Sequence, residues 1–264
     1  MTALLRNNVK IQGSAEGRSM LFAHGYGCDQ GMWRHVAPAF QHDYRTVLFD
    51  HVGAGQSDHT AYSTTRYAPL QGYAEDIVQI GRELGMENAV FVGHSVSAMM
   101  GILAAAQAPG MFSHLILVAP SPCYINDGDY VGGFSGEDIS ELLVSLEQNH
   151  IGWSRAIAPV IMGNPDRAEL AGELEESFCR IHPDIASHFA RTTFCSDERG
   201  ALESVVVPSL ILQCTADVIA PLSVGSYMHA RMPGSTLVVM RATGHCPNLS
   251  APEETIFAIR SYLS

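Results

Sequence analysis

The chain is poor in positive charge. It carries 15 Lys and Arg residues against 27 Asp and Glu residues, which gives a formal net charge of −12 at pH 7. A nucleic-acid-binding protein needs a basic surface that displaces counterions from phosphates, and this sequence has no basic run, so nucleic acid is excluded as a partner. Charged residues make up only 16% of the chain and apolar residues 47%. This balance excludes a disordered chain and indicates a large buried core.

Long uninterrupted apolar runs are also absent. The N-terminal segment MTALLRNNVKIQG contains no apolar stretch of the kind that forms a secretory signal. Residues 88–126 are the longest stretch without Asp, Glu, Lys or Arg, but Gly93, Ser95 and Pro109 interrupt it, so no run of about 18 apolar residues exists for a membrane span. The six cysteines form no Cys-x-x-Cys pair. We therefore expect reduced thiols in a cytoplasmic protein that does not enter a membrane.

The motifs of common metal and dinucleotide sites are missing. There is no His-Glu-x-x-His pair, and His182 and His188 lie 6 residues apart, which places them off one common helical face. No Gly-x-Gly-x-x-Gly segment opens a helix after a strand. We expect no bound metal and no cofactor.

The sequence does contain a regular alternation of short apolar runs and helical patterns. The short runs suit strands that are covered on both faces, and we expect strands over residues 19–23, 45–49, 89–92, 114–118, 209–213 and 236–240. Apolar side chains at spacings of three and four predict a helix from Leu70 to Leu84, with further helices over 96–107 and 252–263. The alternation predicts an α/β fold with a mostly parallel central sheet flanked by helices, and a ligand site beyond the carboxyl ends of its strands.

One segment interrupts this alternation. From about residue 121 to residue 202 the strand signal disappears, and helical patterns follow at 139–148, 151–162, 168–181 and 183–194. We therefore expect a core made of residues 1–120 and 203–264, with a helical insertion at 121–202 between two strands.

The segment Gly93-His94-Ser95-Val96-Ser97 follows an expected strand and opens an expected helix. This setting is typical of a nucleophile elbow, a tight turn that holds a serine hydroxyl out beyond the edge of the sheet. Ser97 stands where the usual motif has Gly, and serine is small enough to let strand and helix approach closely. A serine at position 95 excludes the dehalogenase chemistry of this fold, which needs a carboxylate there. We predict that Ser95 is the nucleophile.

Two further residues follow strands in the chain order of a catalytic triad on such a fold. Asp217 comes after the strand at 209–213, and His245 comes after the strand at 236–240. An imidazole at 245 can remove the serine proton and return it to the leaving group, and a carboxylate at 217 can hold the imidazole tautomer. Asp50, which also ends a strand, remains an alternative acid. We interpret His94 as structural, because its side chain should point away from the nucleophile.

A glycine-containing loop after the first expected strand is the candidate for stabilising negative charge. The loop is His24-Gly25-Tyr26-Gly27. Attack on an ester builds charge on the carbonyl oxygen, and two backbone N–H groups can stabilise it, one from this loop and one from the residue after the nucleophile. The predicted oxyanion hole therefore consists of the Tyr26 and Val96 amides.

Longer blocks of sequence surround these motifs. They are His24-Gly25-Tyr26-Gly27-Cys28-Asp29-Gln30 with Trp33, then 93–98, 120–124 with Gly132-Gly133-Phe134, 149–153, 208–214 and 244–247. Over nearly its whole length the chain resembles the α/β-hydrolase superfamily, in particular the RsbQ-like bacterial energy-stress regulators and the related strigolactone and karrikin receptor hydrolases. The resemblance implies an α/β-hydrolase fold whose insertion is a four-helix lid over a closed apolar pocket.

The resemblance also implies which side chains line that pocket. The matching positions are Tyr26, Phe134, Leu142, Trp153, Ile157 and Phe194. A mostly apolar cavity suits a small hydrophobic ligand. Tyr26 stands where the family usually has Phe, which would bring a hydroxyl to the pocket mouth, and Ile157 stands where some receptors have Phe, which would widen the pocket.

Two main functions follow as hypotheses. The first is a serine hydrolase that cleaves a small hydrophobic ester, lactone or enol ether through an acyl-enzyme, with the RsbQ-like regulatory role that the resemblance implies. The second, implied by the resemblance, is a signalling module with little turnover whose lid reports ligand capture to a sensor-bearing protein phosphatase. A general carboxylesterase is a further alternative. Nothing in the sequence requires more than a monomer.

Overall fold

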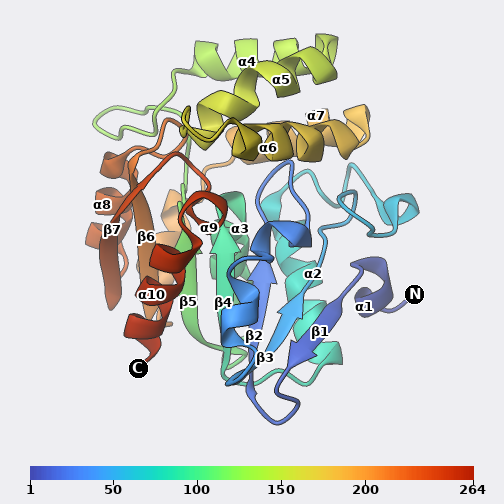
Figure 1. The fold of residues 1–264 in the computed structure, drawn as a ribbon, viewed down its shortest axis with the longest axis vertical. Helices are drawn as coiled ribbons and strands as arrows, with labels where there is room; N and C mark the ends of the chain where they lie inside the picture. The colour runs from blue at the N-terminus through green and yellow to red at the C-terminus, as the bar shows by residue number, and fades with distance from the viewer.

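The structure is a computed structural model that describes residues 1–264. A seven-stranded sheet forms its centre, in the order β1-β3-β2-β4-β5-β6-β7 (Figure 1). The strands are β1 (Lys10–Gly13), β2 (Arg18–Ala23), β3 (Tyr44–Leu48), β4 (Ala89–His94), β5 (Phe112–Val118), β6 (Ser209–Ala216) and β7 (Ser235–Thr243). β1 runs antiparallel to β3, and every other neighbouring pair is parallel. The predicted mostly parallel sheet is confirmed.

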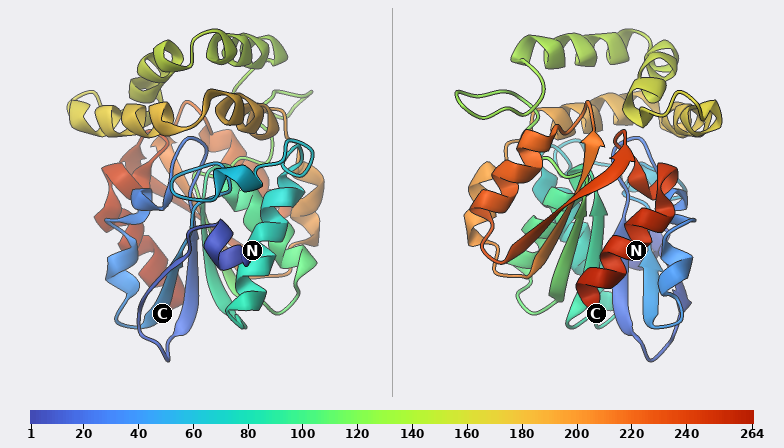
Figure 2. Two further views of the ribbon diagram at one scale, coloured as in Figure 1. Left: turned by 90° about the vertical axis from the view of Figure 1, so that its right-hand side faces the viewer. Right: turned by 60° about the vertical axis from the view of Figure 1, so that its left-hand side comes forward.

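Helices cover both faces of this sheet (Figure 2). The core helices are α1 (Ala3–Arg6), α2 (Leu70–Glu83), α3 (Val96–Gln107), α8 (Leu222–Arg231), α9 (Pro247–Ser250) and α10 (Pro252–Leu263), with 3-10 turns at η1 (Gln30–Trp33), η2 (Ala37–Phe40), η3 (His59–Ala61) and η4 (Arg199–Ser204). Side chains alternate along each strand: Leu21 packs in the layer that contains α2 and α3, whereas Met20 and Phe22 pack in the layer that contains α10 and η1. Buried apolar side chains therefore pack against both faces of the sheet.

Four more helices lie between β5 and β6 in the chain: α4 (Gly136–Gln148), α5 (His150–Met162), α6 (Ala168–Arg180) and α7 (Pro183–Phe194). Figures 1 and 2 show them as a layer across one end of the sheet, above the carboxyl ends of the parallel strands. The helix predicted to begin at residue 139 begins at Gly136, because Ser135 and Asp138 form a reciprocal capping box that ends the preceding loop. The other three begin within one residue of the predicted positions.

Two elements carry no sequence signal that predicts them. All four residues of β1 are exposed, so its side chains show no pattern of burial. The helix α8 buries only Val224, Gly225 and Met228, which leaves it without a clear apolar stripe. No helix of the chain is at once long enough and apolar enough to span a membrane.

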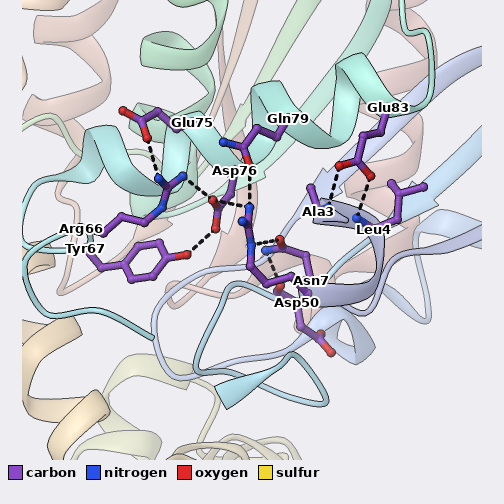
Figure 3. Close-up of polar contacts among 11 residues, drawn as sticks. Ala3, Leu4, Asn7, Asp50, Arg66, Tyr67, Glu75, Asp76, Gln79 and Glu83 are labelled. Atoms are coloured by element: carbon purple, nitrogen blue, oxygen red, sulfur yellow. Dashed lines mark hydrogen bonds and ion pairs between the residues drawn. The ribbon is translucent and has the colours of Figure 1, made fainter. Parts of the chain in front are cut away.

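A buried carboxylate fastens the N-terminal segment to α2 (Figure 3). The side chain of Asp76 is 1% exposed and accepts hydrogen bonds from Arg6 Nη2 at 2.7 Å, Arg66 Nη2 at 2.8 Å and Tyr67 Oη at 2.7 Å. Two turns farther along α2, Glu83 accepts the first N–H group of α1 at 2.7 Å. These contacts hold the edge of the core together and involve no residue at the carboxyl end of β4, β6 or β7, so we assign them a structural role.

Candidate active site

Ser95 occupies the tight turn between β4 and α3. Its backbone has φ 57° and ψ −126°, a strained conformation that residues other than glycine rarely adopt. The turn requires a small residue before it, because a Cβ at Gly93 would lie 2.7 Å from the carbonyl oxygen of Ser97. The N–H of Ser95 donates to the carbonyl of Val118 at 2.8 Å. This is the geometry of a nucleophile elbow, and it holds the hydroxyl beyond the end of the sheet.

Three polar side chains from different strands meet at this edge. His245 Nε2 lies 2.7 Å from Ser95 Oγ, and His245 Nδ1 lies 2.7 Å from Asp217 Oδ2. All three residues are buried. Because a carboxylate only accepts hydrogen bonds, we assign the proton to Nδ1, which leaves Nε2 free to accept the serine hydroxyl. The arrangement can therefore move a proton from Ser95 to His245.

The carboxylate of Asp217 is fixed by the backbone that follows β6. Its Oδ1 accepts the N–H groups of Ile219 at 2.8 Å and Ala220 at 3.1 Å. With Oδ1 occupied in this way, Oδ2 is directed at the imidazole of His245. The orientation of the acid is thus set by the main chain.

The alternative acid, Asp50, has a different place. Its carboxylate accepts the N–H of Gln30 at 2.8 Å, the Nδ2 of Asn8 at 2.7 Å and the N–H of Gln56 at 2.9 Å, and it makes no contact with His245. These bonds stabilise the loops after β2 and β3. The structure brings Asp217, and not Asp50, to the imidazole.

The loop that carries His245 is held from two sides. His94 Nε2 donates to the carbonyl of His245 at 2.8 Å, and the N–H of His245 donates to the carbonyl of Ile161 in α5 at 2.9 Å. Gly244 has φ 77°, and a Cβ there would lie 1.8 Å from the carbonyl oxygen of Met162, so only glycine lets α5 approach this closely. Burial lowers the pKa of His94 to about 3, which keeps its ring neutral. His94 contacts the backbone of the catalytic loop and not the serine hydroxyl.

The loop after β2 contains an amide without a hydrogen-bond acceptor. The N–H of Tyr26 has no acceptor in the protein, and Val96 is the first residue of α3, whose N–H has no partner within the helix. The loop is anchored by His24, whose Nδ1–H donates to the carbonyl of Gly25 at 2.9 Å while Nε2 accepts the N–H of His51 at 3.0 Å. Burial lowers the pKa of both histidines, so they remain neutral.

Ser97 does more than provide a small side chain. Its hydroxyl donates to the carbonyl of His24 and accepts from His51 Nε2 at 2.8 Å. A glycine, the usual residue at this position, could make neither bond. The departure from the usual motif therefore ties the elbow to the loop that carries Tyr26, a role that the sequence pattern alone does not indicate.

A small apolar cavity lies directly against the three polar side chains. Its volume is about 30 Å³, which is room for on the order of one water molecule. Its lining is contributed by the loop after β2, the elbow, the loop after β5, helices α5 to α7 and the loops after β6 and β7, and comprises Tyr26, Cys28, His94, Ser95, Tyr124, Ile161, Leu174, Phe178, Thr193, Phe194, Ile219, His245 and Cys246. Tyr124 Oη lies 3.4 Å from Ser95 Oγ, longer than an ordinary hydroxyl–hydroxyl hydrogen bond.

Of the six side chains expected in this lining, two are present and four are not. Tyr26 and Phe194 line the cavity, whereas Phe134, Leu142, Trp153 and Ile157 lie outside it. For Trp153 the reason is an aromatic layer: the Tyr26 ring packs at 5.9 Å from Phe178, which packs at 5.7 Å from Trp153. Phe178 approaches so closely that a Cβ at Gly27 would lie 2.1 Å from its ring.

The extra hydroxyl expected at the pocket mouth points elsewhere. Tyr26 Oη donates to the carbonyl of Ala186 in α7 at 3.2 Å, so it joins the loop to the helices above it. The side chains that sequence reasoning misses in the lining include Leu174 and Phe178. Their spacing of four on α6 indicates that they share one face of that helix, but it does not indicate that this face reaches the site.

The two cysteines beside the cavity are neutral thiols. Burial raises the pKa of Cys28 to about 12 and raises that of Cys246 well above its ordinary value. A thiolate is the nucleophilic form of cysteine, so neither competes with Ser95. All six cysteines are unpaired, and no group of three or more His, Cys, Asp or Glu side chains is arranged to hold a metal ion.

A larger hollow exists on the surface, away from this site. It is a groove of about 870 Å³ between β7 and α10, bordered by Met240, Phe257 and Tyr262 among others. None of the three polar side chains of the buried site reaches it. The three polar side chains of the candidate active site therefore lie against the small cavity and not against this groove.

Comparisons with known proteins place the chain in a family. The model of the Alpha/beta hydrolase family matches residues 20–258. The chain is 40% identical over 251 residues to a probable esterase of Oryza sativa subsp. japonica, which covers 95% of this chain and 93% of that protein. It is 38% identical over 257 residues to the Karrikin insensitive 2 receptor IA of Petunia hybrida, covering 97% of this chain and 93% of the relative.

A solved structure is similar over the same length. A hydrolase from Oleispira antarctica superimposes with a TM-score of 0.96 at 39% sequence identity, and the match covers 99% of this chain and 96% of that chain. The predicted fold class and the resemblance to strigolactone and karrikin receptor hydrolases are confirmed. The chain belongs to the alpha/beta hydrolase family and is an esterase-type serine hydrolase.

Proposed function

We propose that the protein hydrolyses a small, mostly apolar carboxylic ester or lactone, or an enol ether of the same size, with Ser95 as nucleophile, His245 as general base and Asp217 as the residue that orients His245. The observation that supports this most strongly is the continuous hydrogen-bonded row from Asp217 Oδ2 through His245 to Ser95 Oγ, with both distances at 2.7 Å. The names of the relatives, which include esterases and small-molecule receptors, agree with a ligand of this class.

The proposed reaction has two halves. Ser95 Oγ attacks the carbonyl carbon while its proton passes to His245 Nε2, and the Tyr26 and Val96 amides hold the resulting oxyanion. Collapse of this intermediate breaks the bond to the alcohol oxygen, which takes the proton from His245 and leaves an acyl group on Ser95. A water molecule then attacks the acyl carbon and gives its proton to His245. The second collapse releases the acid and returns the proton to Ser95.

The size and polarity of the cavity limit the substrate. Apolar side chains form most of the lining, and α4–α7 act in this proposal as a lid over a core of residues 1–120 and 203–264. A volume of about 30 Å³ is too small for any ester, so binding must displace part of the wall. We assign the lining side chains Tyr26 and Phe194 to the substrate pocket in the closed form. Phe134, Leu142, Trp153 and Ile157 can reach a ligand only if the aromatic layer opens.

Labelling with a fluorophosphonate tests the nucleophile. Intact-protein mass spectrometry should show one added label on the wild-type protein and none on Ser95→Ala. The matched control is Ser154→Ala, which removes another buried serine, one whose hydroxyl bonds only within α5. Equal labelling rates in wild-type protein and Ser95→Ala would refute the assignment, whereas loss in both variants would point to misfolding, which circular dichroism detects.

A second candidate function is ligand-dependent signalling in the manner of the RsbQ-like regulators, with a sensor-bearing protein phosphatase as partner and little turnover. The contact that favours it is the bond from the N–H of His245 to the carbonyl of Ile161, because it joins the catalytic loop to α5 directly. Covalent change at the site could thus reach the outer surface of the helices. This proposal also states that the protein is a cytoplasmic monomer that binds neither nucleic acid nor membrane.

A binding experiment separates the two functions. The protein is immobilised with and without prior exposure to a butenolide, and the partners retained from a bacterial lysate are compared. A partner set that depends on the butenolide and is lost in Ser95→Ala supports signalling. An unchanged partner set together with rapid turnover of many simple esters supports a carboxylesterase instead.

A further inference from the structure

One residue that lines the cavity carries a hydroxyl without a hydrogen-bond partner. Thr193, in the last turn of α7, is 1% exposed and lines the cavity, and its Oγ1 is buried without any donor or acceptor. Buried hydroxyls are almost always paired, because an unpaired one has lost its bonds to water without replacement. The atom therefore needs an explanation.

Thr193 also does not make the side-chain hydrogen bond to the helix backbone that is common at its position. A threonine or serine inside a helix commonly donates to the carbonyl four residues earlier, as Ser154 does to His150 at 2.8 Å. The neighbouring Thr192 donates instead to the carbonyls of Tyr67 at 2.9 Å and Ala68 at 3.0 Å, which ties α7 to the segment before α2. Of these three hydroxyls, only that of Thr193 is left over.

Each of the other hydroxyls around the cavity has a polar neighbour in the protein. Tyr26 Oη donates to the carbonyl of Ala186, Ser95 Oγ bonds to His245, and Tyr124 Oη has one long contact, at 3.4 Å from Ser95 Oγ. The remainder of the lining is apolar or belongs to the catalytic loops. Thr193 is thus the one wall hydroxyl of this cavity that is free to meet a ligand and that bonds to none of the three catalytic side chains.

We infer that the Thr193 hydroxyl determines specificity by donating a hydrogen bond to a second oxygen of the substrate, one that is not the reacting carbonyl. This inference rests on the proposed function. It narrows the substrate class to esters or lactones that carry an additional ether, hydroxyl or carbonyl oxygen on an otherwise apolar frame. A site with a buried, unpaired donor discriminates against an analogue that lacks the matching acceptor, since that analogue leaves the donor unpaired.

Matched pairs of p-nitrophenyl esters test this. Methoxyacetate is compared with butyrate, 3-methoxypropanoate with pentanoate, and 4-methoxybutanoate with hexanoate, so that an oxygen replaces a methylene at three distances from the carbonyl. For each pair, kcat/KM of the ether ester is divided by kcat/KM of the ester with a methylene in its place. The ratio of each variant is then divided by the wild-type ratio, so that differences in intrinsic reactivity between the two esters cancel. In Thr193→Val the ratio should fall about 3- to 10-fold for at least one pair, and Thr193→Ser should retain it.

The Tm gives an independent test, because we expect it to change in opposite directions for substitutions of two neighbouring residues. Thr193→Val should raise the Tm by about 2–4 °C, because it replaces an unpaired buried hydroxyl with a methyl group of the same shape. The matched control, Thr192→Val, should lower the Tm and leave the ester ratios unchanged, because it removes two bonds outside the cavity.

The failures of the two proposals can be told apart. Absence of fluorophosphonate labelling of the wild-type protein would count against the proposed function. Normal labelling with ester ratios unchanged within twofold in all three pairs would overturn the inference about Thr193 alone. So would a lower Tm for Thr193→Val, since it would mean that the hydroxyl is bonded within the protein.

Discussion

Replacing Asp217 with Asn is expected to trap the catalytic imidazole in the wrong tautomer. Asp217 Oδ1 accepts two backbone N–H groups, so an asparagine at 217 must place its carbonyl oxygen there and its NH₂ at the position of Oδ2. That NH₂ then donates to His245 Nδ1, which forces the ring proton onto Nε2. A protonated Nε2 cannot accept the proton of Ser95.

The size of the effect follows from the same two backbone bonds. Turning the amide over would restore the tautomer, but it would set the NH₂ against the N–H groups of Ile219 and Ala220. Losing two buried hydrogen bonds costs about 2–6 kcal/mol in total. At one factor of ten per 1.4 kcal/mol, kcat should fall about 30-fold to 20,000-fold, with little change in KM because substrate does not contact residue 217.

The assay is steady-state hydrolysis of p-nitrophenyl butyrate by the wild-type protein and by Asp217→Asn, with circular dichroism and Tm to show that the variant folds. Asp50→Asn is the comparison, because Asp50 is the alternative acid and its carboxylate bonds to Asn8 and to the loops after β2 and β3, not to His245. A kcat for Asp217→Asn within threefold of wild type would refute the reasoning. So would a larger loss in Asp50→Asn at unchanged Tm.

Two further predictions concern stability. Asp76→Asn removes the carboxylate that Arg6 and Arg66 share, while Arg66 keeps its ion pair with Glu75 at 3.0 Å. Because these arginines are 17% and 31% exposed, we expect about 2–3 kcal/mol of destabilisation in urea unfolding, less than for a fully buried pair, with kcat unchanged. For His94, a folded pKa of about 3 against about 6.5 in the unfolded chain means that the unfolded state takes up a proton first as pH falls. Stability should therefore decrease below pH 6.5, by about 2 kcal/mol at pH 5 from this residue alone, and equal unfolding free energies at pH 7.5 and pH 5 would contradict this.

The positions of the three proposed catalytic residues could be predicted because each follows a strand. Short apolar runs indicate buried strands, parallel strands bring their carboxyl ends to one edge, and residues just past those ends meet there. Ser95 follows β4, Asp217 follows β6 and His245 follows β7 by two residues. The argument needs only the order of the elements, and small errors in their bounds do not change it.

The lining of the cavity could not be predicted in the same way. Periodicity shows which face of a helix points inward, but not which of several helices approaches closest. Ile157 and Leu142 were expected there from resemblance, yet Leu174 and Phe178 of α6 reach the site first. The bond from Ser97 to His24 is equally invisible in a local pattern, because it joins residues 73 apart in the chain.

The contacts of the helices above the site indicate which one moves when a ligand enters. A cavity of about 30 Å³ holds no ester, so some part of the wall must yield. The end of α5 is joined to the catalytic loop by the buried bond from His245 to Ile161. The helix α6 is joined to the loop after β2 by one part-buried bond, from Ser177 Oγ to the carbonyl of Gly27 at 2.8 Å, and by the exposed ion pair of Arg180 with Asp29 at 3.3 Å. Exposed pairs contribute little, about 0–1 kcal/mol, so we expect α6 to carry Phe178 away from the cavity while α5 stays in place. Hydrogen exchange should then be faster over residues 168–180 than over 150–162, and a covalent fluorophosphonate adduct should change the rates in α6 most; faster exchange in α5 would show that the catalytic loop itself opens.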